Sequence, residues 1–148
     1  ALQPATLTAL AKRRGNGPHA VLTPHAGEYA RLRGTQAGPV PNEILRAFCA
    51  ENNVVTVLKS SFSQVACADE VVYSPTGGPV LARGGSGDVL AGLIAGMLAQ
   101  SPTEPFLSAC RAQHWYGLAA DTLARRSGHH ATTTSELIDA MAPALREL

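Results

Sequence analysis

The chain has 148 residues, of which 45% are hydrophobic and 16% are charged, a balance typical of a globular domain with an apolar core. The formal net charge is +1 and the basic residues are spread along the chain, so composition argues against nucleic acid as a partner. The longest apolar run, residues 89–99, is far shorter than the ~20 residues of a membrane helix, and the first residues lack the order of a signal peptide. We therefore expect residues 1–148 to form one cytoplasmic domain without membrane contact.

The three cysteines predict neither a disulfide framework nor a zinc site. Cys49, Cys67 and Cys110 are odd in number, far apart and without the short spacings of zinc ligands. Free thiols in a reducing compartment are expected.

The first half of the chain predicts short helices around a strand. Pro4 suits the first turn of a helix, and Gly34 suits the end of another. Ile44, Leu45 and Phe48 have helical spacing and are expected to face the core. The predicted segments are a helix at 4–13, a strand at 19–23, a helix at 27–33 and a helix at 41–52.

The second half predicts a strand, a hairpin and three helices. "NVVTVLK" is β-branched and apolar and ends at Lys59. Thr133 and Glu136 fit a capping box before the last helix, which Pro143 should end or kink. This order of elements predicts an α/β layered domain with about two parallel strands, fewer than a doubly wound sheet usually has. The predicted segments are a strand at 53–59, a hairpin turning at 68–70, and helices at 88–100, 104–126 and 135–148.

A glycine-rich loop, "GGSGD", leads into the first of these three helices. Gly84, Gly85 and Gly87 leave room for a ligand to approach the backbone amides, and the start of the helix favours an anion. The loop is neither a Walker loop nor a dinucleotide fingerprint. One interpretation is a phosphate-binding anion hole; the other is that Ser86 or Asp88 merely caps the helix.

An aspartate beside a phosphate site needs a chemical reason, because a second anion there is unfavourable. Accepting a proton from an attacking hydroxyl is such a reason, which makes Asp88 the candidate catalytic base. Gly92 and Gly96 lie on one face of the helix and are expected to let another backbone pack closely.

Longer stretches resemble a known family. "GGSGDVLAG" (84–92) resembles the GxGD signature of ribokinase-like kinases. "LTPHAGEYARL" (22–32), together with the stretch from "VVTVLKSSFSQ" to "GGSGDVLAGLIAGMLAQ" (54–100), resembles the C-terminal half of the ADP- or ATP-dependent NAD(P)H-hydrate dehydratase family. The resemblance continues weakly through "YGLAAD" and "TTSELIDA".

The resemblance implies a ribokinase-like layered sheet flanked by helices, of which this chain is the C-terminal half. It also implies repair of nicotinamide cofactors. The ring hydroxyl of hydrated NADH or NADPH is phosphorylated at the expense of ADP or ATP, and loss of phosphate restores the double bond. Mg²⁺ and a homo-oligomeric state are expected from the same resemblance, whereas no metal-ligand set is predicted and the choice between ADP and ATP stays open.

The resemblance also assigns roles to residues. Asp88 would take the hydroxyl proton and contact the substrate, and His25 would touch the hydrated dinucleotide. The phosphate would lie on Gly84, Gly85, Ser86 and Gly87; the nucleotide would be held by Lys59, Ser60, Ser61, Phe62, Ser63 and Gly87.

The residues themselves leave alternatives open. His25 follows a strand and either faces a crevice or bonds to its own loop. Lys59 ends a strand, where open α/β sheets bind ligands, or is a solvated surface lysine. Glu28 fits a first-turn acid better than a magnesium ligand. Of the other histidines, His114 is expected to be packed, and the pair at 129–130 is not expected to bind a metal.

Two departures from the family pattern affect ligand contacts. Ser60 stands where the family usually has glycine, and Ser74 and Gly78 stand where it commonly has asparagine. Two other functions therefore stay open: a kinase for a small alcohol such as a vitamin precursor or sugar, and a truncated nucleotide-binding module without turnover.

Overall fold

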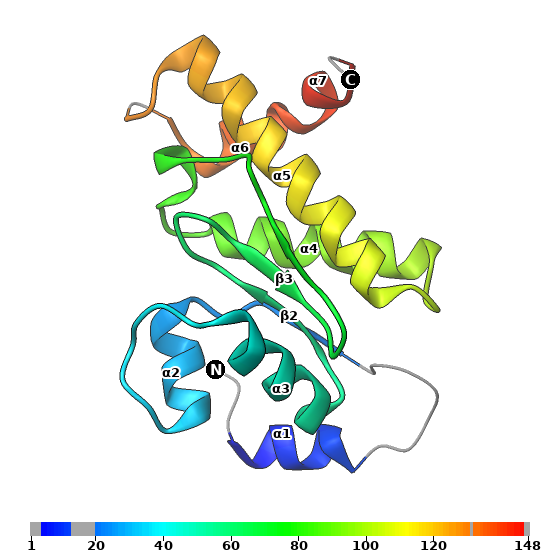
Figure 1. The fold of residues 1–148 in the computed structure, drawn as a ribbon. Coiled ribbons are helices and arrows are strands. Elements are labelled where there is room, and N and C mark those ends of the chain that lie inside the picture. The colour runs from blue at the N-terminus through cyan, green and yellow to red at the C-terminus, as the bar shows by residue number, and fades with distance from the viewer. Residues whose placement is uncertain (1–3, 13–19, 131, 147–148) are drawn as a thin grey trace.

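The computed structural model describes residues 4–12, 20–130 and 132–146 as a small sheet with helices on both faces (Figure 1). The sheet has the order β1-β2-β3-β4. β1 and β2 are parallel, whereas β3 pairs antiparallel with β2 and β4 pairs antiparallel with β3. The strands are β1 (Val21–Leu22), β2 (Val55–Leu58), β3 (Gln64–Ala66) and β4 (Val71–Tyr73).

The helices follow the predicted order. α1, α2 and α3 lie on one side of the sheet, and α4 and α5 lie on the other (Figure 1). This arrangement confirms the predicted sheet flanked by helices. The elements are α1 (Pro4–Ala11), α2 (Ala26–Arg33), α3 (Asn42–Asn52), the 3₁₀ helix η1 (Pro79–Leu81), α4 (Ser86–Gln100), α5 (Pro105–Ser127), α6 (Thr134–Asp139) and α7 (Met141–Arg146).

β2 is an interior strand of the sheet and sends apolar side chains to both of its faces. Val55 and Val57 pack into the cluster formed with α4 and α5, while Leu58 packs into the cluster beneath α1, α2 and α3. All four residues of the strand are buried. A continuous β-branched run of this kind is typical of a strand covered on both faces.

The parallel pairing of β1 and β2 places their carboxyl ends side by side. A further parallel bridge joins His25 to Lys59 just beyond the two strands. The Lys59 N–H also donates to the Pro24 carbonyl at 2.9 Å. Two residues distant in sequence therefore meet at the edge where open α/β sheets bind ligands.

Two expectations about helix faces were wrong. Ile44 is 44% exposed, whereas Leu45 and Phe48 are buried as predicted. Gly92 and Gly96 are exposed, and no described atom lies within 4 Å of a Cβ built on either one. Close backbone packing at these glycines is therefore not present within the described part of the chain.

The last predicted helix is two helices. α6 ends at Asp139 and α7 begins at Met141, so the chain bends before Pro143 rather than after it. Pro143 has no N–H to donate to the carbonyl four residues earlier, which is that of Asp139, and its ring crowds that carbonyl. The predicted capping box of Thr133 and Glu136 is confirmed.

The cysteines are free thiols, as expected. Burial raises the pKa of Cys49 and of Cys110 to about 11, so both thiols are protonated at neutral pH. Among the described residues, no helix combines the length and the apolarity needed to cross a bilayer.

Candidate functional site

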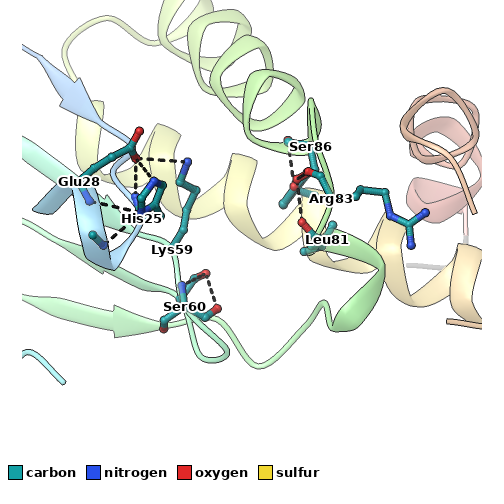
Figure 2. A network of polar contacts seen from close by, with 10 residues as sticks. His25, Glu28, Lys59, Ser60, Leu81, Arg83 and Ser86 are labelled. Carbon is teal, nitrogen blue, oxygen red and sulfur yellow. Dashed lines mark hydrogen bonds and ion pairs between the residues drawn. The ribbon is translucent and has the colours of Figure 1, made fainter. Parts of the chain in front are cut away.

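His25 begins α2 and caps it. Its Nδ1 accepts hydrogen bonds from the N–H groups of Gly27 at 3.1 Å and Glu28 at 3.3 Å. In return, Glu28 Oε2 accepts the His25 N–H at 2.8 Å, which completes a capping box (Figure 2). His25 is thus bonded to its own loop, and its Nε2 lies 3.6 Å from Glu28 Oε2; the side chain is nevertheless 55% exposed, so a ligand can reach it.

Glu28 and Lys59 bring opposite charges to the same place. Lys59 Nζ lies 4.0 Å from Glu28 Oε2 and points toward it in Figure 2. The hydrogen bond from the His25 N–H holds the pKa of Glu28 below its ordinary value, and the positive charge of Lys59 acts in the same direction. Glu28 is therefore a first-turn acid, as the sequence favoured, and is ionised at neutral pH.

The glycine loop reaches the same region through Lys59. A Cβ built on Gly87 would lie 3.1 Å from Lys59 Nζ, so the ammonium group rests against this glycine. The TPHAGE segment, the end of β2 and the GGSGD loop thus form one site. Figure 2 shows the Lys59 side chain between the start of α2 and the start of α4.

The start of α4 offers backbone N–H groups rather than a side-chain cap. Gly85 is the N-cap residue and has a left-handed conformation with φ of 82°, which favours glycine. The amides of Gly84, Gly85 and Gly87 have no hydrogen-bond partner among the described residues, whereas the Asp88 N–H donates to the Gly85 carbonyl at 3.1 Å. Free amides at a helix start are suited to an anion.

The capping alternative for Ser86 and Asp88 was wrong. The Ser86 hydroxyl donates instead to the Leu81 carbonyl at 2.7 Å and lies 2.9 Å from the Arg83 carbonyl, which ties η1 to α4 (Figure 2). Asp88 is exposed, and its carboxylate has no hydrogen bond or ion pair within the described ranges. The aspartate is consequently available for chemistry.

The turn after Lys59 is organised by serine side chains. Ser60 Oγ donates to the Phe62 carbonyl at 2.7 Å, and the Phe62 N–H donates back to Ser60 Oγ at 3.2 Å. Ser63 Oγ lies 3.4 Å from the Ser60 carbonyl, to which it donates. Hydroxyls thus close the turn where the family usually has glycine, and Phe62 is left 71% exposed at its tip beside Ser61.

Residues that the sequence did not single out support the glycine loop and the loop that precedes it. Tyr116 donates to the Ser86 carbonyl at 2.9 Å, and Thr134 donates to the Gly84 carbonyl at 2.8 Å. Asp121 accepts the Gly77 N–H at 3.1 Å. Tyr116 and Asp121 belong to the "YGLAAD" stretch of α5, whose weak resemblance was the only signal for them.

The packed position predicted for His114 was wrong. His114 is exposed, although the neighbouring Gln113 and Tyr116 are buried. Just beyond the end of α5, the His129 carbonyl accepts a hydrogen bond from Arg83 at 3.4 Å. The described residues contain no group of three His, Cys, Asp or Glu side chains arranged to hold a metal ion.

A cavity of about 260 Å³ lies beside the start of α2. Thr23, Pro24, Glu28 and Arg31 are among its lining residues, so it adjoins the His25 loop on the β1 side of the sheet.

Comparison with known proteins gives consistent matches. A family model described as NAD(P)H-hydrate dehydratase matches residues 5–143. The bifunctional NAD(P)H-hydrate repair enzyme Nnr of Moorella thermoacetica is 40% identical over 132 residues, which are 86% of this chain and 25% of that protein. The ADP-dependent (S)-NAD(P)H-hydrate dehydratase of Bacillus subtilis is 33% identical over 88% of this chain and 49% of that protein.

Solved structures match in the same way. The ADP/ATP-dependent NAD(P)H-hydrate dehydratase of Bacillus subtilis, co-crystallised with ATP and Mg²⁺, superposes with a TM-score of 0.78 and 32% identity. The match covers 94% of this chain and 52% of that chain. A ribokinase-like superfamily protein of Enterococcus faecalis matches with a TM-score of 0.74 and 27% identity. That match covers 96% of this chain and 50% of the other chain.

The chain thus spans about a quarter of the bifunctional relatives and about half of the single-function ones. The family model covers nearly all of the chain, from the first turn of α1 to α7. The chain belongs to the NAD(P)H-hydrate dehydratase family, and its α/β structure matches about half of the ribokinase-like fold of these relatives.

Proposed function

We propose that the protein containing this chain repairs hydrated NADH or NADPH by nucleotide-dependent dehydration. A phosphoryl group passes from ADP or ATP to the hydroxyl of the hydrated ring, and that hydroxyl gives up its proton. The phosphate ester then leaves as inorganic phosphate while the ring loses a second proton, so the double bond is restored. Family membership and the names of the relatives support this reaction.

The observation that carries the proposal is the convergence of three segments on one point. Lys59 Nζ lies against Gly87 and 4.0 Å from Glu28, whose helix is capped by His25. A cation beside free helix-start amides is suited to the phosphates of a nucleotide. The acceptor site for a hydroxyl then lies near Asp88, on the first turn of the same helix.

Each residue has a role in this proposal. Asp88 is the general base that accepts the hydroxyl proton, and its freedom from hydrogen bonds supports that role. His25 contacts the hydrated dinucleotide through Nε2–H, because Nδ1 is already the helix cap. The nucleotide is held by the segment 59–63 and Gly87, and the transferring phosphate is held by the residues 84–87.

Mg²⁺ is expected to accompany the nucleotide. Mg²⁺ commonly binds through one or two carboxylates, waters and substrate phosphates rather than in an all-protein cage. Bound there, the ion would neutralise charge on the phosphates.

The test uses the protein at its full natural length with hydrated NADH. Adding ADP or ATP should restore the absorbance of the reduced nicotinamide and release one phosphate per ring. If no absorbance returns with either nucleotide, the dehydratase proposal is wrong. Phosphorylation of a small alcohol without any effect on the hydrate would favour the kinase alternative.

A further inference from the structure

The carbonyl groups of the glycine loop are bonded within the protein, whereas its glycine amides are free. The Arg83 carbonyl accepts the Ser86 N–H at 3.4 Å, and the Gly85 carbonyl accepts the Asp88 N–H at 3.1 Å. In both contacts the donor and the acceptor are three residues apart, so the turn at the start of α4 makes them by itself. The remaining two carbonyls, at residues 84 and 86, are bonded differently.

Two hydroxyl groups from distant helices bind these remaining carbonyls. Thr134, at the start of α6, donates to the Gly84 carbonyl at 2.8 Å, and Tyr116 of α5 donates to the Ser86 carbonyl at 2.9 Å. Tyr116 is 4% exposed, and burial raises the pKa of its phenol, so the group stays a donor at neutral pH. Thr134 also packs against the loop, since a Cβ built on Gly85 would lie 3.5 Å from its methyl carbon.

Each of these hydroxyls sets the direction of a free amide. In a planar trans peptide, the carbonyl of one residue and the N–H of the next point in opposite directions, and every described peptide bond is trans. The contact from α6 to the Gly84 carbonyl therefore turns the Gly85 N–H away from α6. In the same way, the contact from α5 to the Ser86 carbonyl turns the Gly87 N–H away from α5.

The glycines cannot fix these directions by themselves. Glycine has more backbone freedom than any other residue, yet amides stabilise charge on a transferring group only where they already point at it. Lys59 Nζ rests against Gly87, so a cation stands beside one of the two amides. The contacts from α5 and α6 supply the order that the glycines lack.

We propose that Tyr116 and Thr134 are positioning residues, whose hydroxyls hold two peptide groups of the glycine loop so that the amides of Gly87 and Gly85 point at the transferring phosphate. This inference rests on the proposed function and adds two residues that act on the phosphate through the backbone. Their contacts are with carbonyl groups of the loop, on the side away from the free amides.

The test measures steady-state kinetics of hydrate dehydration in the full-length protein. Tyr116→Phe and Thr134→Val each remove one hydroxyl and keep the shape of the side chain. Each should lower kcat by about tenfold, less than the roughly 10²–10³-fold cost of deleting such a donor outright, and should leave KM for the hydrate unchanged. Thr134→Ser restores the hydroxyl and should keep most of the unmodified kcat. A purely structural role would lower the unfolding temperature and leave kcat of the folded variants unchanged.

Two other hydroxyls provide matched controls. Tyr29 is 3% exposed and Thr132 is 7% exposed, and neither hydroxyl has a hydrogen-bond partner among the described residues. Tyr29→Phe and Thr132→Val make the same chemical changes without breaking a contact to the loop, so both should leave kcat unchanged. If the kcat values of Tyr116→Phe and Thr134→Val equal those of the controls, the positioning role is wrong.

Affinity for inorganic phosphate, measured by calorimetry, separates this inference from the proposed function. If the unmodified protein dehydrates no hydrate, the proposed function fails and phosphate binding decides the positioning role. That affinity should then fall by about two- to tenfold in Tyr116→Phe and in Thr134→Val, the usual worth of one hydrogen bond, and stay unchanged in the controls. Equal affinity in all variants, or no phosphate binding by the unmodified protein, would overturn it.

Discussion

His25 uses its two ring nitrogens differently. Nδ1 accepts two backbone N–H groups at the start of α2, so in the neutral ring the proton lies on Nε2. The cap thereby fixes both the orientation of the ring and the donor that it presents. A histidine at this position serves the helix and the proposed substrate site together.

Two substitutions separate these two tasks. His25→Ala removes the cap and should lower the free energy of unfolding by about 1 kcal/mol, whereas His25→Asn supplies another capping oxygen and should keep most of it. Both lose Nε2–H, so both should lower kcat/KM for the hydrate. Urea unfolding and steady-state kinetics measure the two effects, and full kcat/KM in His25→Asn would show that His25 is a cap alone.

Glu28 should make stability depend on pH. The His25 N–H holds the pKa of Glu28 below its ordinary value of 4.5 in the folded protein. Its contribution to the free energy of unfolding is therefore present above 4.5 and is lost as the pH falls through the folded-state pKa. Urea unfolding from neutral pH downward should show a steeper loss for the unmodified protein than for Glu28→Gln. Equal slopes would contradict the role given to the carboxylate.

At the scale of elements, α5 holds the loop that precedes the glycine motif. Gly117 faces Thr76 so closely that a Cβ built on Gly117 would collide with Thr76 Oγ1 and lie 2.8 Å from the Thr76 carbonyl carbon. The loop from β4 to η1 can therefore lie on α5 only where the helix has no side chain. The Gly77 N–H bond to Asp121 fixes the next residue of the same loop.

Gly117→Ala should therefore destabilise the protein by about 1–3 kcal/mol, the usual cost of an overfilled contact. Gly96→Ala is the matched control, because it makes the same change in an exposed part of α4 with no described atom within 4 Å. It should instead raise stability by about 0.5–1 kcal/mol through helix propensity. Thermal unfolding of both variants checks this, and similar stabilities would contradict the close contact.

The elements that the sequence predicted well are those with local causes. β2 follows from its β-branched run, the β3–β4 hairpin from the turn at 68–70, and α6 from its capping box. The errors arise where the rotation of a helix about its own axis decides which residues are buried and which are exposed. Apolar Ile44 lies at the margin of the buried face of α3, and His114 points outward between the buried Gln113 and Tyr116.

At the scale of the whole molecule, the site results from the parallel pairing of β1 with β2. That pairing carries His25 to Lys59, and Lys59 in turn reaches Gly87. The motifs could be found in the sequence, but their mutual distances depend on strand pairing between distant segments.

The chain spans about half the length of the single-function relatives that it matches. Its sheet has β1, a strand of two residues, at one edge, and the cavity near Arg31 lies on that side. The nucleotide and the catalytic base are assigned to described residues, so the chemistry proposed for this half is testable by single substitutions within it.

The most direct test of the account is the rate of hydrate dehydration in Asp88→Asn, measured together with ADP affinity. The substitution keeps the shape of the side chain and removes the base. We predict a rate lower by at least about 10²-fold with ADP affinity unchanged, because positioned general bases contribute about 10²–10⁴-fold. An unchanged rate, or ADP binding without turnover in both proteins, would contradict the assignment of Asp88 as the catalytic base.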